Sequence, residues 1–434
     1  MSDMTATRTL RIIAVVLGAG LWVVAAALLW RTQVPDGLRL PRVSAEGTFP
    51  PAVLAETADY VRFLRLLWLG SVAAELAVLA ALAWRAPVLA ARARGGAVGR
   101  GLQLLLATLV AQWLIALPFG VAAHWWRRRH GVTRQGYLDW ALAPWLHLLA
   151  GVLLACLAVA LAMLLARRLG SRWWLAAAPV LALLGAASIL AEPLLLTPRF
   201  QPLRDRALSA EIERLGAELG VPGIEVRVQR VHDRTRQANA TLQGIGPTRR
   251  LVLWDTLLDG RFTRAEVRFV GAHELGHAAR RHLWKGLAWF TLLSPLLTFG
   301  LAVGTRPRGG LAEPAAVPLA LLVALALQLA LLPFANAISR RYEAEADWVA
   351  LGATRDPAAA RGFFSRLPRT NLSQPEPPTW VRVLLGTHPS LVERIAMAEA
   401  WKRRGSVSTL RRVRRGADAS STLARWTVTS SSRG

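Results

Sequence analysis

The chain contains 434 residues, of which 53% are hydrophobic, and its mean hydropathy of +0.34 is high for a soluble protein. Its net charge of +26 comes from 53 Lys and Arg against 27 Asp and Glu. A basic chain can bind nucleic acid, but no nucleic-acid-binding module is recognisable in this sequence. The arginines instead cluster beside apolar stretches, as at 127–129, which is typical of membrane proteins. The single cysteine, Cys156, excludes an internal disulfide and a cysteine-based zinc site. The composition therefore predicts a membrane protein without a nucleic-acid partner.

Seven apolar stretches are long enough to cross a bilayer as helices, which takes about 20 residues each. Their approximate ranges are 9–30, 64–84, 102–123, 145–166, 174–196, 285–304 and 316–337. Tryptophans near several of the ends, such as Trp30 and Trp84, fit an interfacial aromatic belt. The first stretch is expected to be a retained helix and not a signal peptide, because its basic flank is weak and it shows no clear small-residue cleavage site.

The polar segment 198–284 is predicted to be folded. Leucine and isoleucine recur at helical spacing over 208–219, and the alternation over 224–228 is typical of a half-buried strand. A second strand is expected at 250–254, and 238–242 between them could form a third, edge strand.

The predicted organisation has five parts, which follow the apolar stretches. They are a membrane domain (1–197), the polar segment (198–284), a transmembrane hairpin (285–338), a second polar part (339–402) and a basic, disordered tail (403–434). Seven Lys and Arg between 402 and 415 would be costly to translocate, so both polar parts are expected in the cytoplasm. Richness in Ala, Arg, Leu and Gly suggests a bacterial source, hence the inner membrane; the oligomeric state stays open.

The sequence from His273 to His277 fits the pattern H-E-x-x-H. On a helix the two histidines lie one turn apart on the same face and can bind one zinc ion, while Glu274 is placed to accept a proton from water. Thr263 followed by Glu266 predicts a capping box that starts this helix. A short motif of this kind also occurs by chance, so the alternative is a helix that needs no metal.

Catalytic zinc usually has three protein ligands. His282 does not follow the extended metzincin spacing and stands directly before an apolar stretch, so it is set aside. Glu343 and Asp347 share a helix face, whereas Glu345 points away. Glu343 is therefore predicted to be the third ligand of one zinc ion, and Asp347 to accept the free ring N–H of a liganding histidine. The alternative for these acids is a solvated face paired with neighbouring arginines.

The segments 273–277 and 339–347 resemble the paired motifs of the integral-membrane type I CaaX prenyl protease family and of the related HtpX-type membrane proteases. The stretches 239–258 and 387–395 are similar to further segments of the first family. This resemblance implies a mainly α polytopic membrane protein with about seven transmembrane helices around a chamber. It also implies a gluzincin-type zinc metalloprotease domain that carries a small β-sheet.

The resemblance also implies roles for single residues. Glu274 would be the general base, and His388 would bind substrate or stabilise the tetrahedral intermediate, with Arg394 nearby as a substrate-binding residue. A donor at such a position is physically sensible because negative charge develops on the carbonyl oxygen; the alternative for His388 is a structural turn residue. The edge strand containing Asn239 and Ala240 could bind an extended peptide by strand addition.

The sequence therefore predicts a membrane zinc endopeptidase of the CaaX-protease type, with a peptide or protein substrate and the lipid bilayer as partners. The alternatives are a quality-control protease of the HtpX type and a non-proteolytic metal-binding scaffold or sensor. A scaffold has no need of Glu274, because this residue binds no metal. If the source is bacterial, prenylated substrates are not expected.

Overall fold

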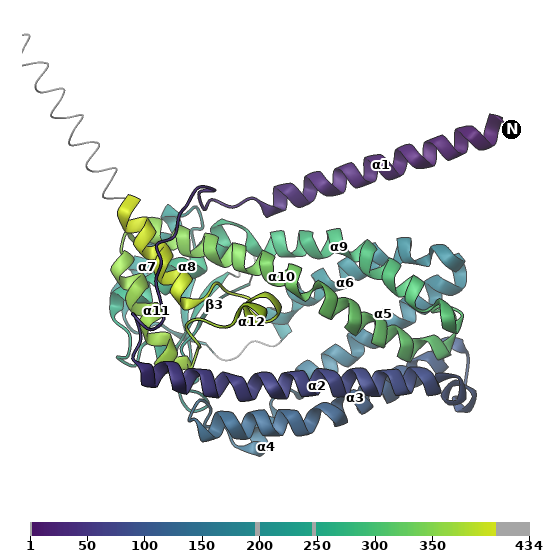
Figure 1. The fold of residues 1–434 in the computed structure, drawn as a ribbon, viewed down its shortest axis with the longest axis horizontal. Helices are drawn as coiled ribbons and strands as arrows, with labels where there is room; N and C mark the ends of the chain where they lie inside the picture. The colour runs from purple at the N-terminus through teal and green to yellow at the C-terminus, as the bar shows by residue number, and fades with distance from the viewer. Residues whose placement is uncertain (1, 196–199, 245–248, 405–434) are drawn as a thin grey trace, which may run out of the picture.

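The computed structural model describes residues 2–195, 200–244 and 249–404. These residues form a mainly helical molecule in which long apolar helices run lengthwise and the polar elements gather at one end (Figure 1). The predicted disordered tail lies outside the described residues from 405 onward, whereas 403–404 end a helix over 391–404.

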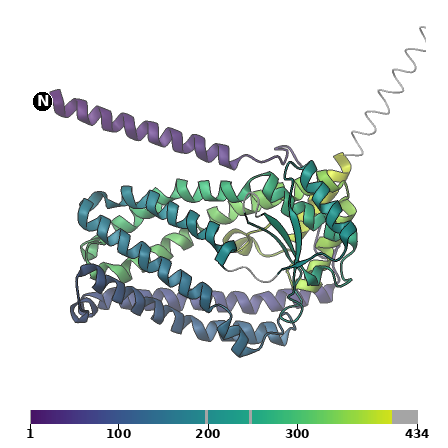
Figure 2. The ribbon, with the colours of Figure 1, turned by 180° about the vertical axis from the view of Figure 1, so that it is seen from behind.

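Seven long helices contain the apolar stretches. They are α1 (Ser2–Trp30), α2 (Pro51–Arg92), α3 (Ala97–Arg129), α5 (Trp145–Leu169), α6 (Trp173–Leu195), α9 (His282–Gly304) and α10 (Val317–Thr354). The short α4 (Tyr137–Leu142) lies between α3 and α5. Seen from either side, α1 diverges from the other helices toward its N-terminus (Figures 1 and 2). Its later part contacts α9, where the Trp22 indole N–H donates to the Leu292 carbonyl oxygen (3.0 Å).

Five stretches of the described chain are long and apolar enough to cross a membrane. They are Pro51–Arg92, Ala97–Arg129, Tyr137–Ile189, His282–Gly304 and Pro314–Thr354. The third of these contains both α5 and most of α6, and Val16–Trp30 of α1 is a shorter apolar helix. The mainly helical membrane architecture is thus found, while the number of seven crossings stays a prediction.

The outer faces of these helices carry large apolar side chains. Trp84, Leu153 and Leu183 are each 70% exposed. Water-facing helices would bear polar residues at such positions, whereas helices that face lipid expose apolar ones. Together with their length, this exposure indicates an integral membrane protein.

The polar end is built on a small mixed sheet with the strand order β1-β2-β4-β3. Its strands are β1 (Gln201–Pro202), β2 (Glu225–Gln229), β3 (Ala240–Gln243) and β4 (Arg250–Trp254). β2 and β4 pair in parallel, and β3 pairs antiparallel with β4. The predicted strand 250–254 is found as expected, the other two are shifted by one or two residues, and β3 is an edge strand as predicted. β1 was not predicted, because two residues carry no alternation pattern.

One hydrophobic core joins the sheet to the helices that cover it. These helices are α7 (Arg206–Glu218), α8 (Arg264–Ala279), α11 (Pro357–Asn371) and the helix over 391–404, while the short α12 (Thr379–Leu384) packs on α10. Ile212 of α7 is fully buried, and its side chain lies where a Cβ on Gly271 of α8 would meet it at 3.2 Å. Phe269 of α8 meets Phe364 of α11 edge to face, with ring centroids 5.6 Å apart. Burying each such side chain contributes about 2 kcal/mol.

The start of α8 is set by the predicted capping box. The Thr263 hydroxyl accepts from the Glu266 backbone N–H (3.3 Å), and the Glu266 carboxylate accepts from the Thr263 N–H (2.8 Å). Arg366 of α11 donates to the same carboxylate (3.0 Å), which ties the two helices together. This cap fixes the beginning of the helix that carries the H-E-x-x-H residues.

Candidate metal centre

Helices α8 and α10 bring the three predicted ligands together. The Nε2 atoms of His273 and His277 lie 3.2 Å apart. Glu343 Oε2 lies 3.3 Å from Nε2 of His273, and the other oxygen, Oε1, lies 3.4 Å from Nε2 of His277. Among the described residues, these three form a group whose ligand atoms could hold one metal ion.

The spacing of these atoms fits zinc. Zinc binds nitrogen and oxygen at about 2.0–2.1 Å in a tetrahedron, whose corners are then about 3.3 Å apart. The distance between the two imidazole nitrogens is close to that value, and each of these nitrogens has one Glu343 oxygen at a similar distance. The buried Oε2 of Glu343 also accepts no hydrogen bond of acceptable geometry from the described residues, although histidine nitrogens surround it. Two imidazoles and a carboxylate in this arrangement fit a divalent cation.

The glycine of the motif allows α8 and α10 to approach closely. A Cβ atom on Gly276 would lie 3.2 Å from the Ala346 carbonyl oxygen and 3.3 Å from its Cα. Both contacts are with backbone, which cannot turn aside as a side chain can. The ligands of α8 therefore reach Glu343 because position 276 carries no side chain.

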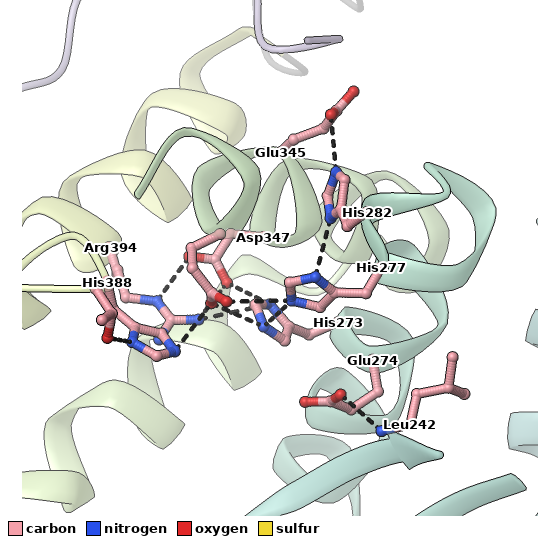
Figure 3. A network of polar contacts seen from close by, with 11 residues as sticks. Leu242, His273, Glu274, His277, His282, Glu345, Asp347, His388 and Arg394 are labelled. Carbon is pink, nitrogen blue, oxygen red and sulfur yellow. Dashed lines mark hydrogen bonds and ion pairs between the residues drawn. The ribbon is translucent and has the colours of Figure 1, made fainter. Parts of the chain in front are cut away.

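His273 is held from behind by a buried ion pair. Its Nδ1 lies 2.8 Å from Asp347 Oδ1, and Arg394 donates to both oxygens of that carboxylate, at 2.7 and 2.6 Å (Figure 3). The Arg394 guanidinium also lies 4.2 Å from the centroid of the Phe364 ring. Asp347 thus lies beside the ring N–H of a predicted ligand, His273, and Arg394 contacts mainly Asp347.

Burial and neighbouring charges set the protonation of the two histidines. Burial, reinforced by the charge of His273, lowers the pKa of His277 to about 3, so its ring is neutral and offers a lone pair. Burial also disfavours a charge on His273, but the carboxylates of Asp347 and Glu343 outweigh it and raise its pKa to about 10. A cation at the site would therefore compete with one proton.

Glu274, which follows His273 on α8, lines the same cavity as the three predicted ligands. Its Oε2 accepts a hydrogen bond from the Leu242 backbone N–H of β3 (3.2 Å; Figure 3). Burial raises the pKa of its carboxyl group to about 7, and the charge on Glu343 acts in the same direction. This value suits a group that must both accept and release a proton near neutral pH.

His388 approaches the site from the loop before the helix over 391–404. Its Nε2 lies 3.2 Å from Glu343 Oε2, and its Nδ1 lies 2.9 Å from the Thr387 hydroxyl. The side chain is 55% exposed, so it faces the cleft and not the core. The structure therefore brings His388 together with the predicted ligands.

Two cavities meet at these residues. One, of about 500 Å³, extends toward α2 and α11 and is lined by both apolar and polar side chains, with Arg65 and Gln374 among the polar ones. The other, of about 900 Å³, extends along β3 toward the start of α9. Both are lined by Asn239, Ala240, Glu274 and His388, so these residues lie where the two cavities meet.

The edge strand β3 presents backbone groups to this cleft. The Asn239 carbonyl oxygen accepts from the Trp254 N–H of β4, whereas the Leu242 N–H points the opposite way, to Glu274. Because strand backbone groups alternate in direction, Ala240 turns its N–H and C=O to the same side as Leu242. The geometry is suited to adding a peptide strand.

Two residues beside the site, Asn371 and His282, were not predicted to belong to it from the sequence. The Asn371 side chain pairs with the backbone of Ala238, accepting from its N–H (2.9 Å) and donating to its C=O (3.0 Å), which fixes the start of the edge strand. His282, set aside above, lies beside His277. No local pattern marks Asn371, because its partner is distant in the sequence.

Comparison with known proteins agrees with this geometry. Residues 202–402 match peptidase family M48. The chain is 30% identical over 299 residues to the "Uncharacterized metalloprotease YhfN" of Bacillus subtilis (strain 168), covering 66% of this chain and 70% of that protein. It is 30% identical over 219 residues to "CAAX prenyl protease 1 homolog" of Oryza sativa subsp. japonica, covering 48% of this chain and 51% of the relative.

A solved structure shares the fold. The crystal structure of S. mikatae Ste24p superposes with a TM-score of 0.69 at 20% identity, covering 88% of this chain and 96% of that one. The chain belongs to peptidase family M48 and is a metallopeptidase homologous to the CaaX prenyl proteases. Peptidases of this family depend on zinc, which matches the donor set of His273, His277 and Glu343.

Proposed function

We propose that the chain is a membrane-embedded, CaaX-protease-like zinc endopeptidase, with one zinc ion held by His273, His277 and Glu343. The observation that carries the proposal is the set of ligand-atom distances between 3.2 and 3.4 Å, with Glu274 on the same cleft. When bound, zinc polarises the scissile carbonyl and makes water more acidic. A non-proteolytic scaffold would need no carboxylate at position 274, because Glu274 is not among the metal ligands.

Substrate binding is assigned to the edge strand. An extended peptide pairs with the cleft-facing backbone of Ala240, next to Asn239, and places its side chains in the two cavities. Family membership supports a peptide or protein substrate. Two kinds of substrate are considered: a prenylated protein, and an unfolded membrane protein as for an HtpX-type enzyme. The metal-removal experiment below distinguishes them.

The proton movements are assigned to Glu274. Its carboxylate takes a proton from the attacking water and passes it to the leaving amine. His388, on the open side of the cleft, donates its ring N–H to the carbonyl oxygen as negative charge develops there. Arg394 acts through Asp347, which holds the His273 ring, and not through the substrate.

Metal removal tests the proposal directly. We expect the detergent-purified chain to contain one zinc per chain and to cleave an unfolded reporter protein or a farnesylated CaaX peptide. A chelator should abolish cleavage, and added zinc should restore it, because the ligand set has no other way to activate water. Cleavage that persists after zinc is removed and quantified as absent would overturn the proposal. The substrate that is cut separates the CaaX-type and HtpX-type activities.

We place the metal site on the cytoplasmic face of a bacterial inner membrane, because Lys and Arg are concentrated after the last apolar stretch. In a bacterial host, an alkaline phosphatase fused after residue 404 should be inactive and a green fluorescent protein at the same point should fluoresce, because only the latter folds in the cytoplasm. The opposite pair of results would place the site on the other face.

A further inference from the structure

The second metal ligand, His277, has a hydrogen-bonded support of its own. His282 opens α9 directly after Arg281, whose φ of 55° turns the chain sharply between the two helices. This turn places Nδ1 of His282 2.9 Å from Nδ1 of His277 (Figure 3). On its other side, Nε2 of His282 lies 3.0 Å from the Glu345 carboxylate.

The proton positions along this chain follow from the metal site. His277 offers the lone pair of Nε2 to the metal, so its proton is on Nδ1. A neutral imidazole has one donor and one acceptor nitrogen. His282 therefore accepts at Nδ1 and donates from Nε2 to Glu345, so that both rings have a single consistent tautomer.

Glu345 is held as a fixed, charged acceptor. Its carboxylate is fully buried and accepts from the Arg280 side chain (2.9 Å), Lys285 (3.2 Å) and the Gln33 backbone N–H (2.8 Å). Two cations and a backbone donor stabilise the charge in the absence of water. An acid that was predicted only to point away from the metal thus has a defined partner.

The ring of His282 cannot turn freely. It stacks on Tyr342, with centroids 4.6 Å apart and planes 7° from parallel. The Tyr342 hydroxyl donates to the Leu29 carbonyl oxygen (2.7 Å) and accepts from the Trp289 indole N–H (3.0 Å). The stacking partner is therefore fixed by α1 and α9, and His282 keeps its edge toward His277.

We propose that His282 and Glu345 are positioning residues for the metal ligand His277, as Asp347 and Arg394 are for His273. The pair fixes the tautomer and ring direction of His277 and makes its Nε2 a better donor to the metal. This inference rests on the proposed zinc site but not on peptide cleavage.

The test measures zinc affinity by competition with a chromophoric chelator in the full-length, detergent-purified chain. Replacing His282 by Phe keeps a ring on Tyr342 but removes the acceptor, and should weaken zinc binding by about 10- to 100-fold. Replacing His282 by Gln, whose carbonyl oxygen can accept from His277, should recover much of this loss. The visible spectrum of the cobalt-loaded chain should change in H282F and return toward wild type in H282Q.

A matched control removes another buried histidine. His124 of α3 is 2% exposed, stacks on Trp140 and lies outside the metal centre, so H124F should bind zinc as the wild type does. Zinc affinity of H282F within twofold of wild type, or of H282Q as weak as that of H282F, would overturn the proposal. If H282F does not fold, Glu345→Gln decides, because unchanged affinity in that variant would refute the role of the pair.

These results separate the two proposals. The expected ranking of zinc affinities without any peptide cleavage would support the positioning pair and refute the endopeptidase. A wild-type chain that binds no zinc would refute both.

Discussion

Replacement of Glu274 by Gln is expected to lower the rate of peptide cleavage by about 10²- to 10⁴-fold and to leave bound zinc unchanged. The carboxylate is not among the three ligands, so the metal stays. The amide keeps an oxygen that can accept from the Leu242 N–H, so the side chain stays in place. It cannot take a proton from water, so the chemical step fails. Cleavage rate and zinc content are measured on the same purified sample.

The control for this substitution is Glu213→Gln on α7. Glu213 is an acid on an exposed helix face, where it accepts from Ser209, and the same change of charge should leave cleavage and zinc unaltered. If E274Q retained more than a tenth of wild-type cleavage with zinc bound, another base would have to be sought. Loss of zinc from E274Q would instead place Glu274 among the ligands.

Replacement of Arg394 by Met should destabilise the metal-free protein by about 3–5 kcal/mol, the usual effect of breaking a buried ion pair. The carboxylate of Asp347 is only 2% exposed and would lose the cation that contacts both of its oxygens. The guanidinium also leaves the face of Phe364. Thermal unfolding in detergent, followed by intrinsic fluorescence, measures the shift.

Two further variants make this prediction specific. Asp347→Asn together with Arg394→Met removes both charges while the amide oxygen still accepts from His273, so the loss should be smaller than for R394M alone. Arg361→Met breaks the exposed pair with Glu399 and should cost about 0–1 kcal/mol. A double variant no more stable than R394M would show that packing against Phe364, and not the ion pair, accounts for the loss.

The parts of the site that could be predicted are those encoded by local spacing. His273 and His277, like Glu343 and Asp347, are four residues apart, and a helix necessarily places such pairs on one face. The strand Arg250–Trp254 was predictable because its run of buried apolar residues is unbroken. The close approach of the two helices depends on Gly276. Its role could not be predicted, because Ala346, which faces it, is distant in the sequence.

The contacts that could not be predicted join distant positions or depend on a turn. His282 was set aside by its spacing, but the left-handed backbone at Arg281 turns α9 back so that the ring returns to His277. Asn371 hydrogen-bonds to Ala238, which is 133 positions away in the sequence, and no local pattern marks this pairing. The number of membrane crossings could not be predicted either. Length and hydropathy do not show whether α5 and α6 cross the bilayer as two separate helices.

The continuity of α10 has a consequence for where a substrate is cut. This helix runs unbroken from the apolar stretch to Glu343 and beyond. At about 1.5 Å per residue, the segment from Pro333 to Glu343 is about 15 Å long. The helix therefore holds Glu343 at a fixed distance from the apolar stretch that precedes it. If that stretch lies in the bilayer, we expect the position of cleavage to depend on the depth of a bond relative to the membrane as well as on the neighbouring side chains.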